Sequence, residues 1–103
     1  MASKYRNVRT VVDGIKFASK REAKRYSELR LLEQARKISG LCCQTRYELS
    51  VGKYPICVYV ADFTYIENDR LVVEDVKGVK TAVYRIKKKL MKACYGIEIR
   101  EIK

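Results

Sequence analysis

Residues 56–77 read ICVYVADFTYIENDRLVVEDVK, and this stretch decides the fold. Two runs rich in β-branched and aromatic residues, Ile56–Ile66 and Arg70–Lys77, flank the polar triplet Glu67-Asn68-Asp69. Such runs favour β-strands, and a short polar turn between two of them favours antiparallel pairing. We therefore expect two neighbouring strands, with Asp62 inside the first and Asp75 near the end of the second.

Upstream of this pair the sequence predicts a hairpin, a helix and a further strand. Arg9–Val12 and Ile15–Phe17 flank the turn signal Asp13-Gly14. Ser19 is a helix N-cap, and the helix is expected to run to about Lys37 and to end at Ser39-Gly40. The next strand is expected over Leu41–Val51, followed by a turn over residues 52–55.

Downstream, a helix is expected over Ala82–Tyr95, with Thr81 as its N-cap and Gly96 as its end. Its expected apolar stripe is Val83, Ile86, Leu90 and Cys94. Ile97–Ile102 alternates and predicts a last strand. The whole is an α/β fold, with a hairpin followed by α-β-β-β-α-β and a mixed sheet between two helices. At 103 residues the chain is expected to be one domain, residues 1–103.

The charge balance predicts an anionic partner. Lys and Arg number 23 against 12 Asp and Glu, a net charge of +11. This excess favours nucleic acid, and the alternative is a generic basic protein of the ribosome or of a membrane surface. No apolar run is long enough for a membrane span, and the first residues lack the apolar segment of a signal peptide. We therefore expect a cytoplasmic protein that binds DNA and no membrane.

Histidine is absent from the sequence, and this limits the kinds of catalytic and metal-binding site that the protein can have. Catalysis by Ser-His-Asp or Cys-His groups and metal ligation by histidine are excluded. Hydrolysis would have to use carboxylates, lysine, tyrosine and a hard metal ion such as Mg²⁺ or Mn²⁺.

Asp62, Asp75 and Lys77 form the candidate catalytic group. Asp75 and Lys77 are two residues apart on a strand and so face the same side, and Asp62 can lie across from Asp75. Two such carboxylates can hold a divalent ion, while a lysine can orient water and neutralise charge on a phosphate. The structural alternative is a buried Asp–Lys ion pair that only stabilises the hairpin.

Glu22 is the fourth candidate for metal or water binding. It shares a helix face with Tyr26 and Leu29, so it would point towards the acidic pair if that face packs on the sheet. The alternative is a capping-box glutamate with no catalytic role, because Ser19 lies three residues earlier.

Basic and polar residues around these positions are candidates for DNA contact. A strand end that leads through Gly78 into a helix N-terminus can cradle a phosphate. The candidates are Arg6, Arg9, Lys16, Lys20, Gln44, Lys80, Thr81, Tyr84, Arg85 and Lys88. The alternative for each is a solvated surface position.

The pattern Asp62, a gap of 12 residues, then Asp75-Val76-Lys77 resembles the signature of the PD-(D/E)XK nuclease superfamily. Ala61 stands where that signature nominally has proline. The stretches 12–17, 19–23 and 73–78 also resemble a family of small phage and prophage proteins assigned to that superfamily. The resemblance implies a restriction-endonuclease-like core and an active set of Glu22, Asp62, Asp75 and Lys77. The metal would be held by the three carboxylates and the backbone carbonyl of Val76.

The leading hypothesis is a Mg²⁺- or Mn²⁺-dependent DNA endonuclease of the phage recombination or repair type. A chain of this length has little room for a separate sequence-reading domain, so branched DNA is the favoured substrate. Two-fold symmetric junctions would call for a homodimer. Two alternatives stay open: a non-catalytic nucleic-acid-binding module with the same fold, and a ribonuclease-H type of site that needs no lysine.

Overall fold

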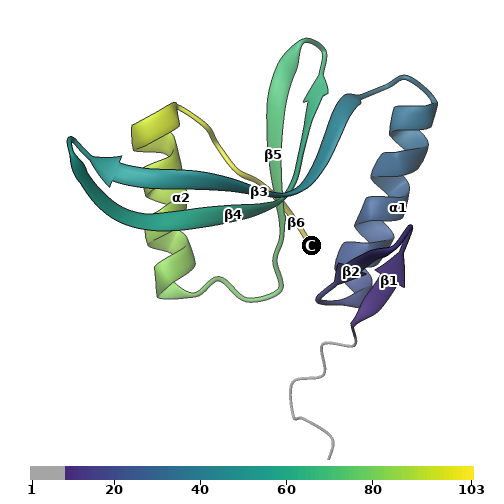
Figure 1. Cartoon of the computed structure of the whole chain (residues 1–103), viewed down its shortest axis with the longest axis horizontal. Coiled ribbons are helices and arrows are strands. Elements are labelled where there is room, and N and C mark those ends of the chain that lie inside the picture. The colour runs from purple at the N-terminus through teal and green to yellow at the C-terminus, as the bar shows by residue number, and fades with distance from the viewer. Residues whose placement is uncertain (1–8) are drawn as a thin grey trace, which may run out of the picture.

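The computed structural model describes residues 9–103 (Figure 1). The elements in chain order are β1 (Thr10–Val12), β2 (Ile15–Phe17), α1 (Lys20–Gln34), β3 (Ser39–Val51), β4 (Tyr54–Glu67), β5 (Arg70–Val76), α2 (Ala82–Tyr95) and β6 (Arg100–Ile102). This order confirms the predicted hairpin followed by α-β-β-β-α-β. Within these residues, neither helix is long and apolar enough to cross a membrane.

The strands form a mixed sheet and a separate hairpin. The four-stranded sheet has the order β3-β4-β5-β6, and β1 pairs only with β2. β3, β4 and β5 are antiparallel neighbours, whereas β6 runs parallel to β5. A parallel neighbour requires a crossover, and α2 supplies it. The predicted α/β class and mixed sheet are thus confirmed.

α1 starts as expected and ends earlier. The Ser19 hydroxyl accepts from the Glu22 N–H at 3.2 Å, the expected N-cap. The helix stops at Gln34, because Arg36 adopts a left-handed φ of 60°. The Lys37 N–H then donates to the Leu32 carbonyl, which completes a Schellman end. The expected end at Ser39-Gly40 was wrong, since an arginine rather than a glycine takes the left-handed position.

α2 has the predicted bounds but buries a different stripe. The Thr81 hydroxyl accepts from the Tyr84 N–H, and Gly96 caps the other end with a φ of 68°. Tyr84 and Met91 are the buried residues, while Val83 and Ile86 are 61% and 58% exposed. The predicted stripe was therefore wrong: two apolar rows run along this helix, and packing selected the row with the tyrosine and the methionine.

Strand ends differ from the prediction by a few residues. β3 begins at Ser39, β4 begins at Tyr54 directly after the turn, and β6 begins only at Arg100. Ile97 and Ile99 were expected in the last strand, but they pack against α2 and its neighbours instead.

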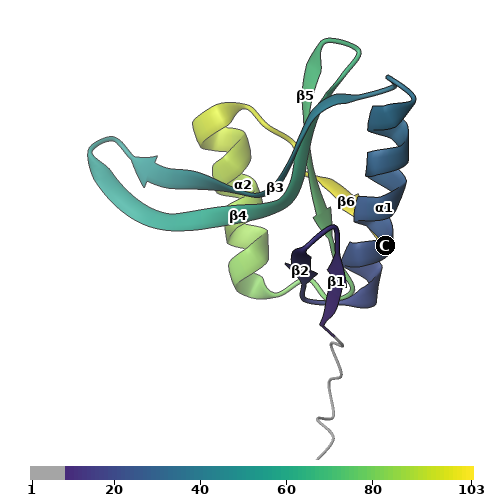
Figure 2. The same ribbon diagram turned by 45° about the vertical axis from the view of Figure 1, so that its right-hand side comes forward.

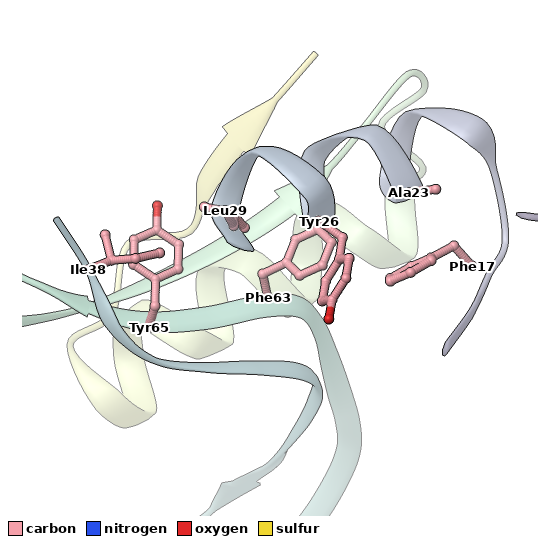
Figure 3. Close-up of a cluster of buried hydrophobic side chains, with 7 residues drawn as sticks. All are labelled: Phe17, Ala23, Tyr26, Leu29, Ile38, Phe63 and Tyr65. Carbon is pink, nitrogen blue, oxygen red and sulfur yellow. The ribbon is translucent and has the colours of Figure 1, made fainter. Parts of the chain in front are cut away.

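Each helix has its own hydrophobic cluster. The α1 cluster comprises Phe17, Ala23, Tyr26, Leu29, Ile38, Phe63 and Tyr65, which Figure 3 shows between the helix and the sheet. The α2 cluster comprises Leu49, Tyr59, Ala61, Val73, Tyr84, Met91 and Ile99. β5 lies between the two, because Val72 packs on the α1 cluster and Val73 belongs to the α2 cluster. The helices therefore cover opposite faces of β5, as predicted.

The β3–β4 hairpin extends beyond the rest of the sheet and curves across α2 (Figures 1 and 2). β5 pairs with β4 only from Phe63 to Glu67. From Tyr54 to Asp62, β4 therefore has β3 on one side and, among residues 9–103, no strand on the other. This free edge of β4 leads directly to Asp62.

Candidate active site and nucleic-acid interface

Asp62 stands at the point where β4 leaves β5. The pair Phe63↔Glu74 fixes the register, and one further step sets Asp62 opposite Asp75. On its other side, β5 pairs with β6, and there Asp75 lies opposite Glu101. The sequence-based expectation that Asp62 lies across from Asp75 thus agrees with the register.

Asp62 also marks a corner in β4. Before it, Tyr59 and Ala61 pack in the α2 cluster; after it, Phe63 and Tyr65 pack in the α1 cluster. Residues two apart on a regular strand face the same side, so the strand must change its orientation here. Asp62 belongs to neither hydrophobic cluster, because successive side chains of a strand point to opposite sides and both of its neighbours are in the clusters.

Gln44 lies opposite this corner in β3. The pairs Cys43↔Phe63 and Thr45↔Ala61 bracket it. Its φ of 57° is left-handed, and the other four non-glycine residues with positive φ in the described chain lie in turns. A left-handed backbone costs a non-glycine residue about 1–2 kcal/mol. The sheet therefore holds strain directly beside Asp62.

The Asp62 carboxylate is partly buried and held by the backbone of β5. Its Oδ2 accepts from the Val76 N–H at 2.8 Å, and no hydrogen bond to its Oδ1 is found in residues 9–103. The pKa of Asp62 is raised to about 7, first by burial and then by repulsion from Asp75 and Glu22, against the Val76 N–H and Lys77. Such an environment favours a bound cation or proton.

Asp75 is the most enclosed member of the candidate group, at 2% exposure. The Tyr59 hydroxyl donates to its Oδ2 at 2.5 Å, and the Lys77 Nζ lies 3.2 Å from its Oδ1. The Lys77 ammonium also lies 4.4 Å from the centre of the Tyr84 ring. Asp75 and Lys77 thus form an ion pair that is partly shielded from solvent, and the Tyr84 ring lies against the Lys77 ammonium.

Glu22 reaches the same region from the first turn of α1. Its pKa is raised by burial and by the Asp75 carboxylate, while Lys77 and the Ala18 backbone N–H lower it. The structure therefore brings Glu22 within electrostatic range of the pair. The alternative from the sequence, a glutamate with no catalytic role, stays open. The N-cap bond uses the backbone N–H of Glu22 rather than its carboxylate.

The carboxylate oxygens of the candidate group suit a hard metal ion, although the described residues form no complete set of metal ligands. Among residues 9–103, no three His, Cys, Asp or Glu side chains gather closely enough to bind a metal by themselves. Mg²⁺ needs less, because it keeps several waters and often uses one or two carboxylates together with substrate phosphates. Asp62 and Asp75 can supply these oxygens. Glu22 and the Val76 carbonyl stay predicted ligands.

A cavity of about 290 Å³ opens beside the group. It lies between the free edge of β4 and the first turns of α2. Its walls are Val58, Tyr59, Val60, Asp62, Asp75, Lys77, Thr81, Val83, Tyr84 and Lys87. The acidic pair and the lysine therefore face a space that a substrate can enter.

A larger groove of about 680 Å³ runs between α2 and β6. Lys80 and Lys88 lie in it, but both pair with Glu101, at 2.9 Å and 3.3 Å. Arg85 and Lys89 line the same groove and form no ion pair within the described chain. A phosphate in this groove would meet two uncommitted cations at once, and it would have to compete with Glu101 for the other two.

The remaining DNA-contact candidates divide between the surface and the interior. Arg9, Lys16, Lys20, Gln44 and Thr81 are exposed, and Arg6 lies outside the described residues. Tyr84 was expected to contact phosphate, but it is 5% exposed and its hydroxyl donates to Glu101 at 2.7 Å. That expectation needs correction, because the ring is part of the core and supports Lys77.

Of the two tyrosines that support the site, Tyr59 was missed and Tyr84 was predicted in another role, as a phosphate contact. Tyr59 holds Asp75, and Tyr84 lies against Lys77. The sequence carries a weak signal for Tyr59, which lies three residues before Asp62 in a strand of apolar residues. A buried tyrosine usually needs a partner for its hydroxyl, and a carboxylate on the next strand is a natural one.

The opposite face of β5 carries a second buried carboxylate with a structural role. Glu74 is fully buried, and Arg25 binds it with two hydrogen bonds of 2.8 Å and 2.6 Å. The Tyr65 hydroxyl donates to the same carboxylate. These bonds join α1 to the sheet, so adjacent carboxylates on one strand have separate roles.

Fold and site together define an α/β protein with a carboxylate–lysine cleft beside a basic helix. The chain belongs to the family described as "Protein of unknown function (DUF1064)", which it matches over residues 2–102. No curated protein and no solved structure matches the chain.

Proposed function

We propose that this protein is a Mg²⁺- or Mn²⁺-dependent nuclease that hydrolyses phosphodiester bonds in DNA. The observation that supports this most directly is the meeting of Asp62, Asp75 and Lys77 at one cavity. The element order and the parallel β5–β6 pair are also what a restriction-endonuclease-like core of the PD-(D/E)XK type would require. The net charge of +11 favours the anionic substrate.

Asp62 and Asp75 would hold the metal, with Glu22 beside them. Bound there, a divalent ion would polarise the phosphate and make a coordinated water more acidic. The environment of Asp62 supports this role, since burial and neighbouring carboxylates raise its pKa. A bound cation would stabilise the charged form of this carboxylate. Tyr59 keeps one oxygen of Asp75 fixed by its hydroxyl.

Lys77 would act on the phosphate and the attacking water. As a water oxygen attacks phosphorus, negative charge grows on the phosphate oxygens and the bond to one bridging oxygen breaks. An ammonium beside that centre stabilises the charge and can orient the water. Asp75 and the Tyr84 ring hold the Lys77 side chain at the cavity for this purpose.

We favour branched DNA of phage recombination or repair as the substrate and a homodimer as the active form. Lys16 and Lys20 on one side, and Arg85 on α2, would contact the backbone without reading sequence. Two active sites related by a two-fold axis would suit a junction with two equivalent strands.

The test compares cleavage of branched, flapped and linear DNA by wild type, Lys77→Ala and Asp62→Ala in Mg²⁺, Mn²⁺ and EDTA. Wild type should cut only with metal. Each variant should lose at least about 100-fold in rate, the range expected for a group acting in proton transfer or charge stabilisation. DNA binding in EDTA should change much less. Cutting by both variants at the wild-type rate would refute the proposal.

A second candidate is a non-catalytic nucleic-acid-binding module with the same fold. The basic groove between α2 and β6, where Arg85 and Lys89 form no ion pair within the described chain, favours it. It predicts tight DNA binding by wild type and no cleavage with any divalent metal. Activity that survives in Lys77→Ala and is lost in Asp62→Ala would instead favour a site of the ribonuclease-H type.

A further inference from the structure

The lining of the cavity beside the acidic pair includes both charged and apolar side chains. Asp62, Asp75 and Lys77 are charged, while Val58, Val60 and Val83 are apolar. A phosphate alone does not account for the valines. Val83 is 61% exposed, so this helix leaves a valine uncovered beside the candidate catalytic group.

We propose that the valines lining this cavity contact an unpaired nucleobase of the DNA strand being cut, an inference that rests on the proposed nuclease function. The volume of the whole cavity, about 290 Å³, lies at the small end of ligand sites and suits one nucleotide better than a base pair. A base in a continuous duplex is stacked and would have to leave the helix to enter. The preferred substrate is therefore DNA with unpaired nucleotides at the cleavage point.

The charges around the cavity favour a nucleic acid strand as the occupant over a second copy of the chain. Lys87 lines the cavity and forms no ion pair within the described residues. Arg85 and Lys89 lie on the same helix but line the neighbouring groove between α2 and β6, and they too form no ion pair within the described residues. A second copy would bring a like-charged helix against these cations, whereas a DNA strand offers bases to the valines and phosphates to the lysines.

The free edge of β4 is consistent with this occupant. The edge runs from the hairpin tip to Asp62 without a neighbouring strand among residues 9–103, and Val58 and Val60 lie on it. An unpaired strand could follow this edge to the acidic pair without collision with another strand of the described sheet.

Binding in EDTA tests the inference apart from cleavage. The probe is a duplex with a short unpaired flap whose adenines are replaced by 2-aminopurine, and a continuous duplex of the same sequence is the reference. Wild type should bind the flap more tightly and change the 2-aminopurine fluorescence. Val83→Ser should weaken flap binding about tenfold, since one apolar side chain of this size loses its contact. Val83→Ile should keep wild-type affinity.

Val51→Ser is the matched control, because Val51 is 60% exposed and does not line this cavity. It should bind both probes as wild type does. Equal affinity of wild type for the flap and the duplex, or unchanged flap binding by Val83→Ser, would overturn the inference. A change in sedimentation of Val83→Ser without a change in flap binding would also overturn it, in favour of a protein interface.

The proposed function can fail separately. If wild type binds the flap through Val83 but cuts no DNA in Mg²⁺ or Mn²⁺, the base site stands and the nuclease proposal falls. If wild type cuts flap and duplex alike and Val83→Ser does the same, the nuclease proposal stands and the base site falls.

Discussion

The Tyr59 hydroxyl donates a 2.5 Å hydrogen bond to Asp75, a carboxylate that is only 2% exposed. This bond links the α2 cluster to the candidate catalytic group. The charged acceptor makes it one of the stronger hydrogen bonds in the chain. Its loss should affect both the stability of the fold and the position of Asp75.

Tyr59→Phe should lower the free energy of unfolding by about 1.5–3 kcal/mol, the usual value for a hydrogen bond to a charged group. It should also slow single-turnover cleavage. Tyr65→Phe is the matched control, because Tyr65 donates to Glu74 on the other face of β5. Urea unfolding and single-turnover rates measure the two effects. Equal loss of rate in both variants would show that Tyr59 acts only through stability.

Asp62→Asn should stabilise the fold in EDTA at pH 8. The wild-type carboxylate is partly buried beside Asp75 and Glu22, which raises its pKa to about 7 and makes its charged form unfavourable. An asparagine can keep the hydrogen bond from the Val76 N–H without the charge. The melting temperature should rise by a few degrees, as about 1 kcal/mol does in a domain of this size.

Adding Mn²⁺ should make wild type more stable than Asp62→Asn. Wild type should gain stability with metal by mass action, and Asp62→Asn should gain little. Glu28→Gln, on the exposed side of α1, should respond to metal as wild type does. A metal-induced shift of the same size in Asp62→Asn would argue against Asp62 as a ligand.

Gln44→Gly should leave the protein at least as stable as wild type, with a gain of up to about 1 kcal/mol. The left-handed φ of 57° suits glycine, and this relief outweighs the larger backbone entropy of glycine when unfolded. Gln44→Val should instead destabilise, because a β-branched side chain tolerates this backbone poorly. Denaturant unfolding of both variants measures the difference. A stable Gln44→Val protein would show that no strain is held there.

Arg25→Met should lower the free energy of unfolding by about 3 kcal/mol or more, because it leaves Glu74 buried without its cation. The double variant Arg25→Met/Glu74→Gln should recover part of this loss. Lys24→Met, an exposed neighbour on α1, is the control and should change stability little. Additive losses in the double variant would contradict a direct pair.

Glu101 should contribute to acid sensitivity. The Tyr84 hydroxyl and Lys80, with a smaller contribution from Lys88, lower its pKa to about 2 from an ordinary value of 4.5. A carboxylate with a lowered folded pKa stabilises the fold fully above pH 4.5, and this contribution is lost as the pH falls towards 2. Glu101→Gln should therefore be less stable at pH 6 and should show a flatter decline in acid.

Glu98→Gln is the control for this measurement. The Glu98 side chain is 79% exposed and pairs only with Lys92. Its replacement should leave the pH dependence of unfolding as in wild type. A Glu101→Gln curve parallel to wild type between pH 5 and pH 2 would contradict the assignment.

The local signals in the sequence predicted most of the elements. The bounds of α2 follow from Thr81 and Gly96, and the N-cap of α1 follows from Ser19. The register that sets Asp62 opposite Asp75 depends on a two-residue turn, Asn68-Asp69, because Glu67 pairs with Arg70, whereas the sequence had predicted a turn over all three residues from Glu67 to Asp69. The helix caps depend on interactions between residues a few positions apart in the sequence, so they can be predicted without knowledge of the rest of the fold.

Features that join distant residues were not predictable in the same way. α2 carries two apolar rows, and the choice of the Tyr84–Met91 row depends on what the sheet offers it. Lys80 and Lys88, two predicted DNA contacts, also pair with Glu101, which the sequence did not indicate. Neither outcome leaves a signal in the residues next to these positions.

By itself, the sequence determined the order of the elements, the N-caps of both helices, the end of α2 at Gly96 and the neighbouring strands that carry Asp62 and Asp75. Only the tertiary structure decided that β4 turns a corner at Asp62, that Tyr59 and Tyr84 support Asp75 and Lys77, and that Val83 stays exposed beside them. The physical reason is how far apart in the chain the interacting residues lie. Caps, turns and register arise from neighbouring residues, whereas burial and hydrogen bonding in the site depend on side chains far apart in the chain.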